Sequence, residues 1–198
     1  ETGLGIMYGA GHSAIVLDSS DSPHVSLLDD TNFDLEYATN ASGSWSTTTL
    51  DSTGHVGFHS SLGIDSQDKV HISYCDISNE VLKYITNTTG SWVAETLGPI
   101  GTSSSYDFST SLAVDSQDKV HISYLYGAPD FDLKYITNAS GSWVSETLDS
   151  FGWTQGGYNS LVVDSQDKVH ISYFYGSFGY DLKYITNKTG SWVSETLD

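Results

Sequence analysis

The sequence predicts an all-β protein, a β-propeller of four four-stranded antiparallel blades in one domain spanning residues 1–198. Two observations support this prediction. The ten residues DSQDKVHISY occur three times without a change, and the letters GSW occur once in each of four copies. Equivalent histidines follow one another at intervals of 47, 50 and 49 residues, at His24, His71, His121 and His170. A unit of ~40–50 residues repeated in this way is typical of propeller blades.

Four copies fill most of the chain. We expect the blades to span residues 13–59, 60–109, 110–159 and 160–198. The first copy has diverged most, because it reads DSSDSPHVSL where the other three read DSQDKVHISY. The blades would form either a closed four-bladed ring or half of a larger ring, for example an eight-bladed ring closed by a homodimer.

The third copy shows the strands expected in every blade. Residues 111–115, 120–125, 133–137 and 142–148 are short segments rich in Val, Ile, Thr, Tyr and Trp, as strands are. Asp-Ser-Gln-Asp-Lys and Asn-Ala-Ser-Gly separate them as tight turns, because aspartate and asparagine side chains bond nearby backbone amides and tolerate left-handed geometry. Since strand direction alternates, these two hairpins share one face of the disc and the variable loops share the other.

Some repeated side chains are predicted to be structural. Each repeated histidine lies within the second strand of its copy, where a metal site would need ligands that converge from elsewhere, so we assign it a packing role. Lys83 and Glu95 are replaced together in the first copy, by Glu36 and Thr48. We therefore expect the lysine and the glutamate to face each other across the third hairpin.

The charge of the chain restricts its partners. The sequence has 25 acidic residues against seven lysines and no arginine, a net charge of −18. Such a surface repels phosphate groups, so we expect no binding to nucleic acid. No apolar run approaches the ~18 residues of a membrane span, so we expect no membrane insertion. A secreted or cell-surface protein fits this composition best.

The segments SLAVDS, VHISYL, DLKYIT and GSW resemble the repeats of bacterial and archaeal secreted β-propeller modules. The pattern is also distantly similar to fucose-binding lectin propellers and to sialidase-like propellers. In the latter an Asp box joins the third and fourth strands, but here Ala139 stands where that box has its aspartate. The resemblance implies the fold and secretion, and implies little about function.

The non-repeating loops form the candidate binding face. Aromatic and polar side chains on loops above a rigid scaffold are typical of binding sites. A platform of Trp and Tyr beside Asp and Gln suits a sugar ring, which stacks on the aromatic ring while its hydroxyls form hydrogen bonds. The candidate ligand-binding residues are Trp153, Tyr106, Tyr158, Phe131, Tyr180, Asp107, Asp132 and Gln155.

These observations predict an extracellular binding or adhesion module that recognises a carbohydrate or glycoprotein, and no enzyme activity. A structural or protein–protein interaction propeller is the main alternative. A glycoside hydrolase is less favoured, and we assign no catalytic residue. A sialidase is disfavoured further because it holds its anionic substrate with arginines, which this chain lacks.

No cofactor is required by this interpretation. Calcium could bind the carboxylates of Asp29, Asp30 and Asp34, although the DSQDK turns lack the spacing of a calcium loop. Glycosylation sequons occupy the third hairpin of every copy, at Asn40, Asn87, Asn138 and Asn187. Any attached glycans would leave the variable face clear.

Overall fold

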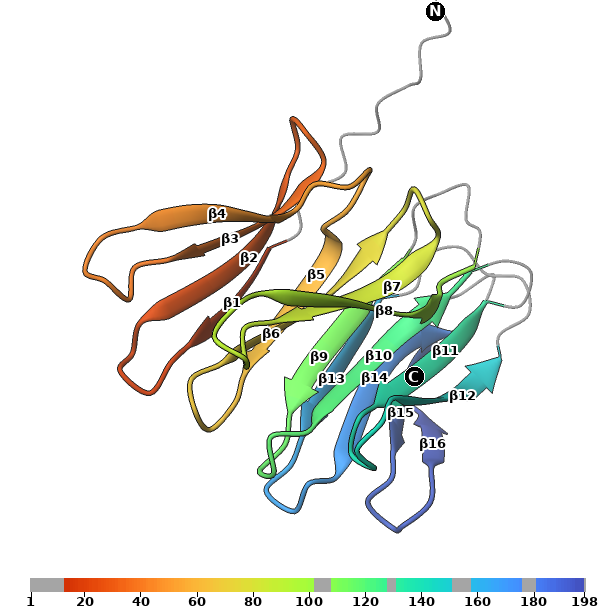
Figure 1. The fold of residues 1–198 in the computed structure, drawn as a ribbon. Helices are drawn as coiled ribbons and strands as arrows, with labels where there is room; N and C mark the ends of the chain where they lie inside the picture. Colours follow the sequence, from red (N-terminus) through yellow and green to blue (C-terminus); the bar gives the residue numbers. More distant parts are fainter. Residues whose placement is uncertain (1–12, 102–107, 128–130, 151–157, 176–180, 198) are drawn as a thin grey trace, which may run out of the picture.

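The structure, a computed structural model, describes residues 13–101, 108–127, 131–150, 158–175 and 181–197. Its strands form four separate four-stranded antiparallel sheets (Figure 1). Within each sheet the strands lie side by side in chain order. The described residues form no helix, and so no helix that could span a membrane occurs among them.

Each sheet is one blade. Blade 1 contains β1 (Ser13–Leu17), β2 (Pro23–Asp29), β3 (Asp34–Thr39) and β4 (Ser46–Asp51). Blade 2 contains β5 (Phe58–Ile64), β6 (Val70–Asp76), β7 (Val81–Thr86) and β8 (Val93–Pro99). Blade 3 contains β9 (Thr110–Val114), β10 (Val120–Tyr126), β11 (Asp132–Thr137) and β12 (Val144–Ser150). Blade 4 contains β13 (Asn159–Val163), β14 (Val169–Tyr175), β15 (Asp181–Thr186) and β16 (Val193–Thr196).

The first hairpin of each blade is closed by its leading aspartate, as the sequence predicts. In blade 2 the backbone amides of Gln67 and Lys69 donate to Asp65 Oδ1 at 2.9 and 2.8 Å. Asp68, later in the same turn, has a φ of 59°, in the left-handed region that aspartate tolerates better than most residues. The turn is therefore specified by two side chains within five residues.

The blades stack in chain order through their first strands, β1 on β5, β5 on β9 and β9 on β13. One hydrophobic cluster fills each of the three junctions. Leu62 packs in the junction between blades 1 and 2, and the equivalent Leu112 and Leu161 pack in the two later junctions. The hydrophobic core of the molecule thus lies between blades.

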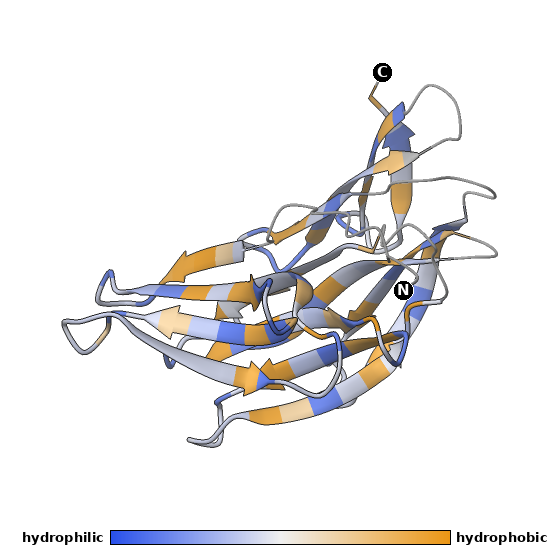
Figure 2. Ribbon diagram, turned by 90° about the horizontal axis from the view of Figure 1, so that it is seen from above, coloured by the Kyte–Doolittle hydropathy of each residue, from blue (hydrophilic) through white to orange (hydrophobic). Residues whose placement is uncertain are grey.

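The stack has two uncovered ends. Every residue of β6 is buried, because blade 2 has a neighbour on both sides, whereas buried and half-buried residues alternate along β2 of blade 1. Ile15 in blade 1, equivalent to the buried Leu62, is 66% exposed, and Val162 in blade 4 is 59% exposed. Figure 2 shows the sheets from above as a fan in which apolar and polar residues alternate along the strands. The described strands form an arc of four blades rather than a closed four-bladed ring.

The expected pairing of Lys83 with Glu95 is wrong. Lys83 lies opposite Thr96 in the register of β7 and β8, while Glu95 lies opposite Tyr84. The lysine instead reaches blade 1, where its ammonium group pairs with Asp51. Lys183 forms the same kind of pair with Asp149 at 2.9 Å, from blade 4 to blade 3. Lys83 and Lys183 therefore join blades, whereas the equivalent Lys134 donates to Thr147 on the neighbouring strand of its own blade.

Candidate functional site

Each blade contains a hydrogen-bonded chain of aspartate, histidine and tyrosine. In blade 2, His71 Nε2 lies 3.2 Å from Asp65 Oδ2 and His71 Nδ1 lies 2.5 Å from the Tyr84 hydroxyl. The carboxylate only accepts hydrogen bonds, so Nε2 carries the proton and donates to it. In the neutral ring, Nδ1 then accepts from the tyrosine hydroxyl. The three side chains come from the first hairpin, the second strand and the third strand.

Burial fixes the protonation states of the histidine and the tyrosine. Desolvation lowers the pKa of His71, and this effect outweighs the neighbouring Asp65 carboxylate, which raises it. Burial raises the pKa of Tyr84 to about 12, so its hydroxyl stays protonated as a donor. Asp–His–Tyr could in principle relay protons, but His71 is only 3% exposed. Because the same hydrogen bonds occur in all four blades, we assign these three side chains a structural role.

A tryptophan of the next blade packs against the tyrosine of this set. Trp143 of blade 3 meets the ring of Tyr84 edge to face, with ring centroids 5.0 Å apart. Its indole Nε1 donates to Glu95 Oε2 of blade 2 at 3.1 Å. Aromatic edge contacts and a charged acceptor together hold the indole against the preceding blade. One tryptophan from each later blade therefore defines the wall between two blades.

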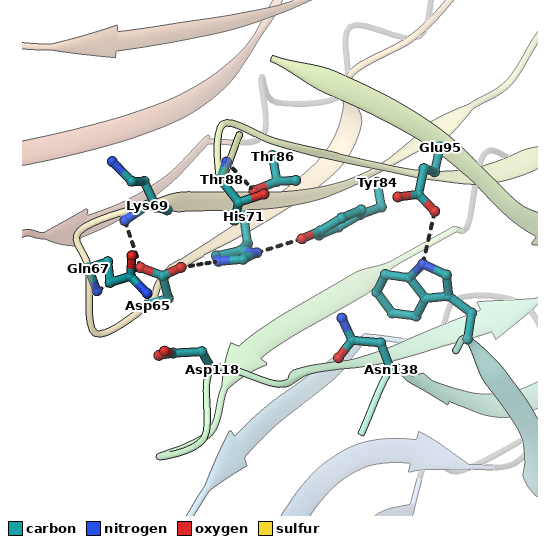
Figure 3. A pocket seen from close by; sticks show the side chains of 11 residues that line it. Asp65, Gln67, Lys69, His71, Tyr84, Thr86, Thr88, Glu95, Asp118 and Asn138 are labelled. Carbon is teal, nitrogen blue, oxygen red and sulfur yellow. Dashed lines mark hydrogen bonds and ion pairs between the residues drawn. The ribbon is translucent and has the colours of Figure 1, made fainter. Parts of the chain in front are cut away.

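A pocket of about 320 Å³ opens at this wall, between blades 2 and 3. Figure 3 shows the Asp65–His71–Tyr84 chain along the pocket, with Asp118 and Asn138 lying opposite. Hydroxyl, amide, carboxylate and ammonium groups form most of its lining, and the Trp143 indole adds an apolar surface. The remaining lining residues are Gln67, Lys69, Thr86, Thr88 and Glu95.

A side-chain latch fixes the two walls of the pocket. Ser66 of blade 2 donates to Asp118 of blade 3 through both its backbone amide and its hydroxyl, each at 2.8 Å. These hydrogen bonds, the amide first, lower the pKa of the Asp118 carboxyl. The same latch joins Ser19 to Asp68 and Ser116 to Asp167 at the other two junctions. The blades are thus held in one repeated geometry.

The pocket's residues recur between blades 3 and 4. Trp192 Nε1 donates to Glu146 Oε1 at 2.8 Å, and Trp192 meets Tyr135 at 5.1 Å between ring centroids. The junction between blades 1 and 2 keeps the contact of Trp92 with Tyr37. There, however, the positions of Gln67, Lys69 and Glu95 hold Ser20, Ser22 and Thr48. Two of the three junctions therefore carry the glutamine, lysine and glutamate, although Ala139 replaces Thr88 between blades 3 and 4.

Most residues predicted from the variable loops fall outside the described part of the chain: Trp153, Tyr106, Tyr180, Asp107 and Gln155. Tyr158 is described and is 64% exposed directly before β13. Phe131 has a φ of 48° and directly precedes Asp132, the first residue of β11. Asp132 is buried, and its Oδ1 accepts no hydrogen bond among the described residues. These three stay predictions as binding residues.

The pocket lies on the face of the invariant hairpins, to which the sequence analysis assigns a scaffold role, and so it is not among the predicted sites. A signal was present in the divergence of the first copy. Gln67, Lys69 and Glu95 change together there, although they lie far apart in sequence. Their common place on one pocket wall accounts for the joint change.

The predicted calcium and glycan positions show local hydrogen bonds. Asp29 accepts from the amide of Thr31 and from the side chain of Asn32, at 2.8 and 2.6 Å, so its carboxylate closes its own turn. Across the described ranges, no group of three or more potential metal ligands converges. In three sequons the asparagine oxygen accepts from a neighbouring strand amide at 2.8 Å, as Asn138 does from Val120.

No protein-family model and no curated protein sequence matches this chain. Among solved structures, the SapL1 lectin in complex with alpha methyl fucoside is similar, with a TM-score of 0.69, 11% identity and coverage of 93% of this chain and 62% of the lectin. A polysaccharide lyase, the ulvan lyase of family PL25, has a TM-score of 0.65 and 12% identity, with coverage of 95% of this chain and 56% of the lyase. A leech intramolecular trans-sialidase has a TM-score of 0.54 and 15% identity, with coverage of 89% of this chain and 30% of the trans-sialidase.

These likenesses show the fold, a β-propeller, in agreement with the resemblance in the sequence to fucose-lectin and sialidase-like propellers. Fucose-binding lectins recur among the similar structures. The chain spans 56 to 62% of the length of the lectin and the lyase.

Proposed function

We propose that the protein is a secreted or cell-surface carbohydrate-binding module whose inter-blade pockets each hold an uncharged sugar. The observation that carries this proposal is the pocket between blades 2 and 3, where Trp143 stands among amide, hydroxyl and carboxylate groups. Its volume of about 320 Å³ falls at the lower end of the range of small-ligand sites. The indole offers apolar surface to a sugar ring, and the polar groups suit its hydroxyls. Lectins of the same fold support the proposal.

Binding rather than catalysis is favoured by the state of the pocket carboxylates. Glycoside hydrolysis needs two carboxylates free to act as acid, base or nucleophile. Here Asp65 accepts from two amides and His71, Asp118 accepts from Ser66, and Glu95 accepts from Trp143. Each carboxylate already has a structural role.

A glycan array, probed with calcium and again with a chelator, tests sugar binding. We expect selective binding to a few related neutral glycans, and calcium dependence would support the predicted site at Asp29, Asp30 and Asp34. No binding under either condition would overturn the proposal and favour a protein-interaction propeller.

Two variants then locate the site. The double variant Lys69→Ala with Lys119→Ala removes one ammonium group from the pocket and the equivalent group between blades 3 and 4, and we expect affinity to fall about tenfold, the effect of about one polar contact. Trp153→Ala changes the variable loop face and should leave affinity unchanged. The reverse outcome would move the site to the variable face.

A further inference from the structure

The two open ends of the arc carry complementary halves of one blade junction. We call the face of a blade that points toward the next blade in the chain its forward face, and the opposite face its backward face. Each of the three junctions joins the forward face of one blade to the backward face of the next. Blade 4 leaves its forward face open and blade 1 its backward face. Ile15 and Leu17 are exposed on the latter, and Val162 and Phe174 on the former.

The unused hydrogen-bonding groups match one another. The latch runs from a serine to the aspartate of the following blade three times, from Ser19, Ser66 and Ser116. By the same alignment Ser165 of blade 4 and Asp21 of blade 1 are the remaining pair. Neither side chain forms a hydrogen bond among the described residues. Asp21 already has the latch conformation, with a φ of 60° against 58° to 59° in Asp68, Asp118 and Asp167.

Each end of the arc also carries one partner of the contact between a tryptophan and the tyrosine of the preceding blade. Trp92, Trp143 and Trp192 each lie against the tyrosine of the preceding blade. Trp45, the equivalent residue of blade 1, meets no other blade among the described residues and is 59% exposed. Blade 4 presents the matching Tyr184 and Glu195 without a tryptophan.

Blade 1 has diverged on both faces but keeps two junction residues on its backward face. On its forward face the pocket positions have changed to Ser20, Ser22 and Thr48. On its backward face Leu27 and Glu36 replace a tyrosine and a lysine of the other blades, whereas Asp21 and Trp45 are retained. Blade 4 retains Gln166, Lys168 and Glu195 on its forward face. A surface without a partner would give no reason to keep both the latch aspartate and the tryptophan of blade 1.

We propose that a second copy of this chain closes the arc, with blade 4 of each copy packed head to tail on blade 1 of the other. Head-to-tail contacts continue until a ring closes, and propeller rings have about 4 to 8 blades. Two copies of these four blades would give a ring of eight, within that range. The ion pair between a lysine and the aspartate of the preceding blade has no counterpart there, because blade 1 has Glu36 in place of the lysine. The junction between blades 2 and 3 also lacks this ion pair, because Gly98 replaces the aspartate.

Closure would complete a further pocket across each new junction. Blade 4 would supply Lys168, His170, Tyr184 and Glu195, and the second copy would supply Trp45. The use of this pocket for sugar rests on the proposed function, whereas the association of two copies does not. Solution mass therefore tests the assembly independently of any ligand.

Light scattering on the eluting chain at about 0.15 M salt, where exposed charges are screened beyond about 8 Å, measures that mass. We expect twice the 21.5 kDa of one chain. Ser165→Asp would set a carboxylate against Asp21 of the second copy and should give the single-chain mass. Ser194→Asp, the same change at an exposed position on β16, should leave the doubled mass.

Circular dichroism would confirm that both variants keep the β-sheet fold. A single-chain mass for the unmodified protein, or an open series of larger masses, would overturn the eight-bladed ring. A doubled mass in the Ser165→Asp variant would also overturn it, because the pair would then associate elsewhere.

Discussion

Tyr84 and Tyr184 donate to equivalent histidines in environments of different exposure. The side chain of His71 is 4% exposed and that of His170 is 19% exposed. Tyr84→Phe would leave buried His71 Nδ1 without a donor and should lower the free energy of unfolding by about 1–3 kcal/mol. Tyr184→Phe should have a smaller effect, because water can replace the lost donor. Urea denaturation measures both, and equal losses would contradict this account.

The neutral state of His71 predicts a pH dependence of stability. Histidine has a pKa of about 6.5 in an unfolded chain, and burial lowers the pKa of His71 in the folded chain. The unfolded state therefore binds this proton first as the pH falls. The stabilisation is complete above about pH 7 and is lost progressively as the pH drops below about 6.5.

Urea midpoints between pH 8 and pH 5 measure this effect. His55→Gln, which changes an exposed histidine, serves as the control and should keep the decline. A midpoint constant over this range would show that His71 keeps its ordinary pKa in the folded protein.

At the scale of the element, Gly63 on β5 lies close to the side chains of the next blade. A Cβ there would lie 2.9 Å from Leu112 Cδ2 and 3.2 Å from Val114 Cγ2 of the next blade. Gly63→Val should therefore overpack the junction and lower the free energy of unfolding by about 1–3 kcal/mol. Val193→Ile, at an exposed position on β16, should change it by less than about 0.5 kcal/mol. Thermal or urea unfolding compares the two, and an unchanged stability in Gly63→Val would show that the blades are looser than described.

Local elements were predictable because their causes lie close together in sequence. The aspartate that closes each first hairpin acts within five residues, and alternating strand residues identify both faces of a blade. Contacts between blades were not predictable in this way. Lys83 pairs with Asp51, 32 residues away on another blade, and the sequence offered the nearer Glu95 as its partner.

The candidate site could be predicted only in part for the same reason. Its residues belong to two blades, and only their packing brings Lys69 and Glu95 opposite Asn138. The sugar-binding character was inferred from aromatic loops on the other face, most of which lie outside the described residues. The pocket adds a second location that no single repeat would reveal.

At the scale of the whole molecule, ring closure depends on the angle between blades, which no single repeat encodes. The repeated latch and tryptophan contacts set one junction geometry, and both ends of the arc present it. If two copies close the ring, the same contacts serve within and between chains. Stability would then depend on protein concentration, because association stabilises the folded state.

The most direct test of sugar binding at the junctions is the response of the five tryptophan indole N–H signals in nitrogen-15 NMR spectra. On titration with a glycan identified by the array, the signals of Trp143 and Trp192 should shift, because Trp143 lines the pocket and Trp192 holds the equivalent place between blades 3 and 4. Trp92 and Trp153 should stay in place. A shift of Trp153 without Trp143 and Trp192 would contradict the junction pockets and place the sugar on the variable face.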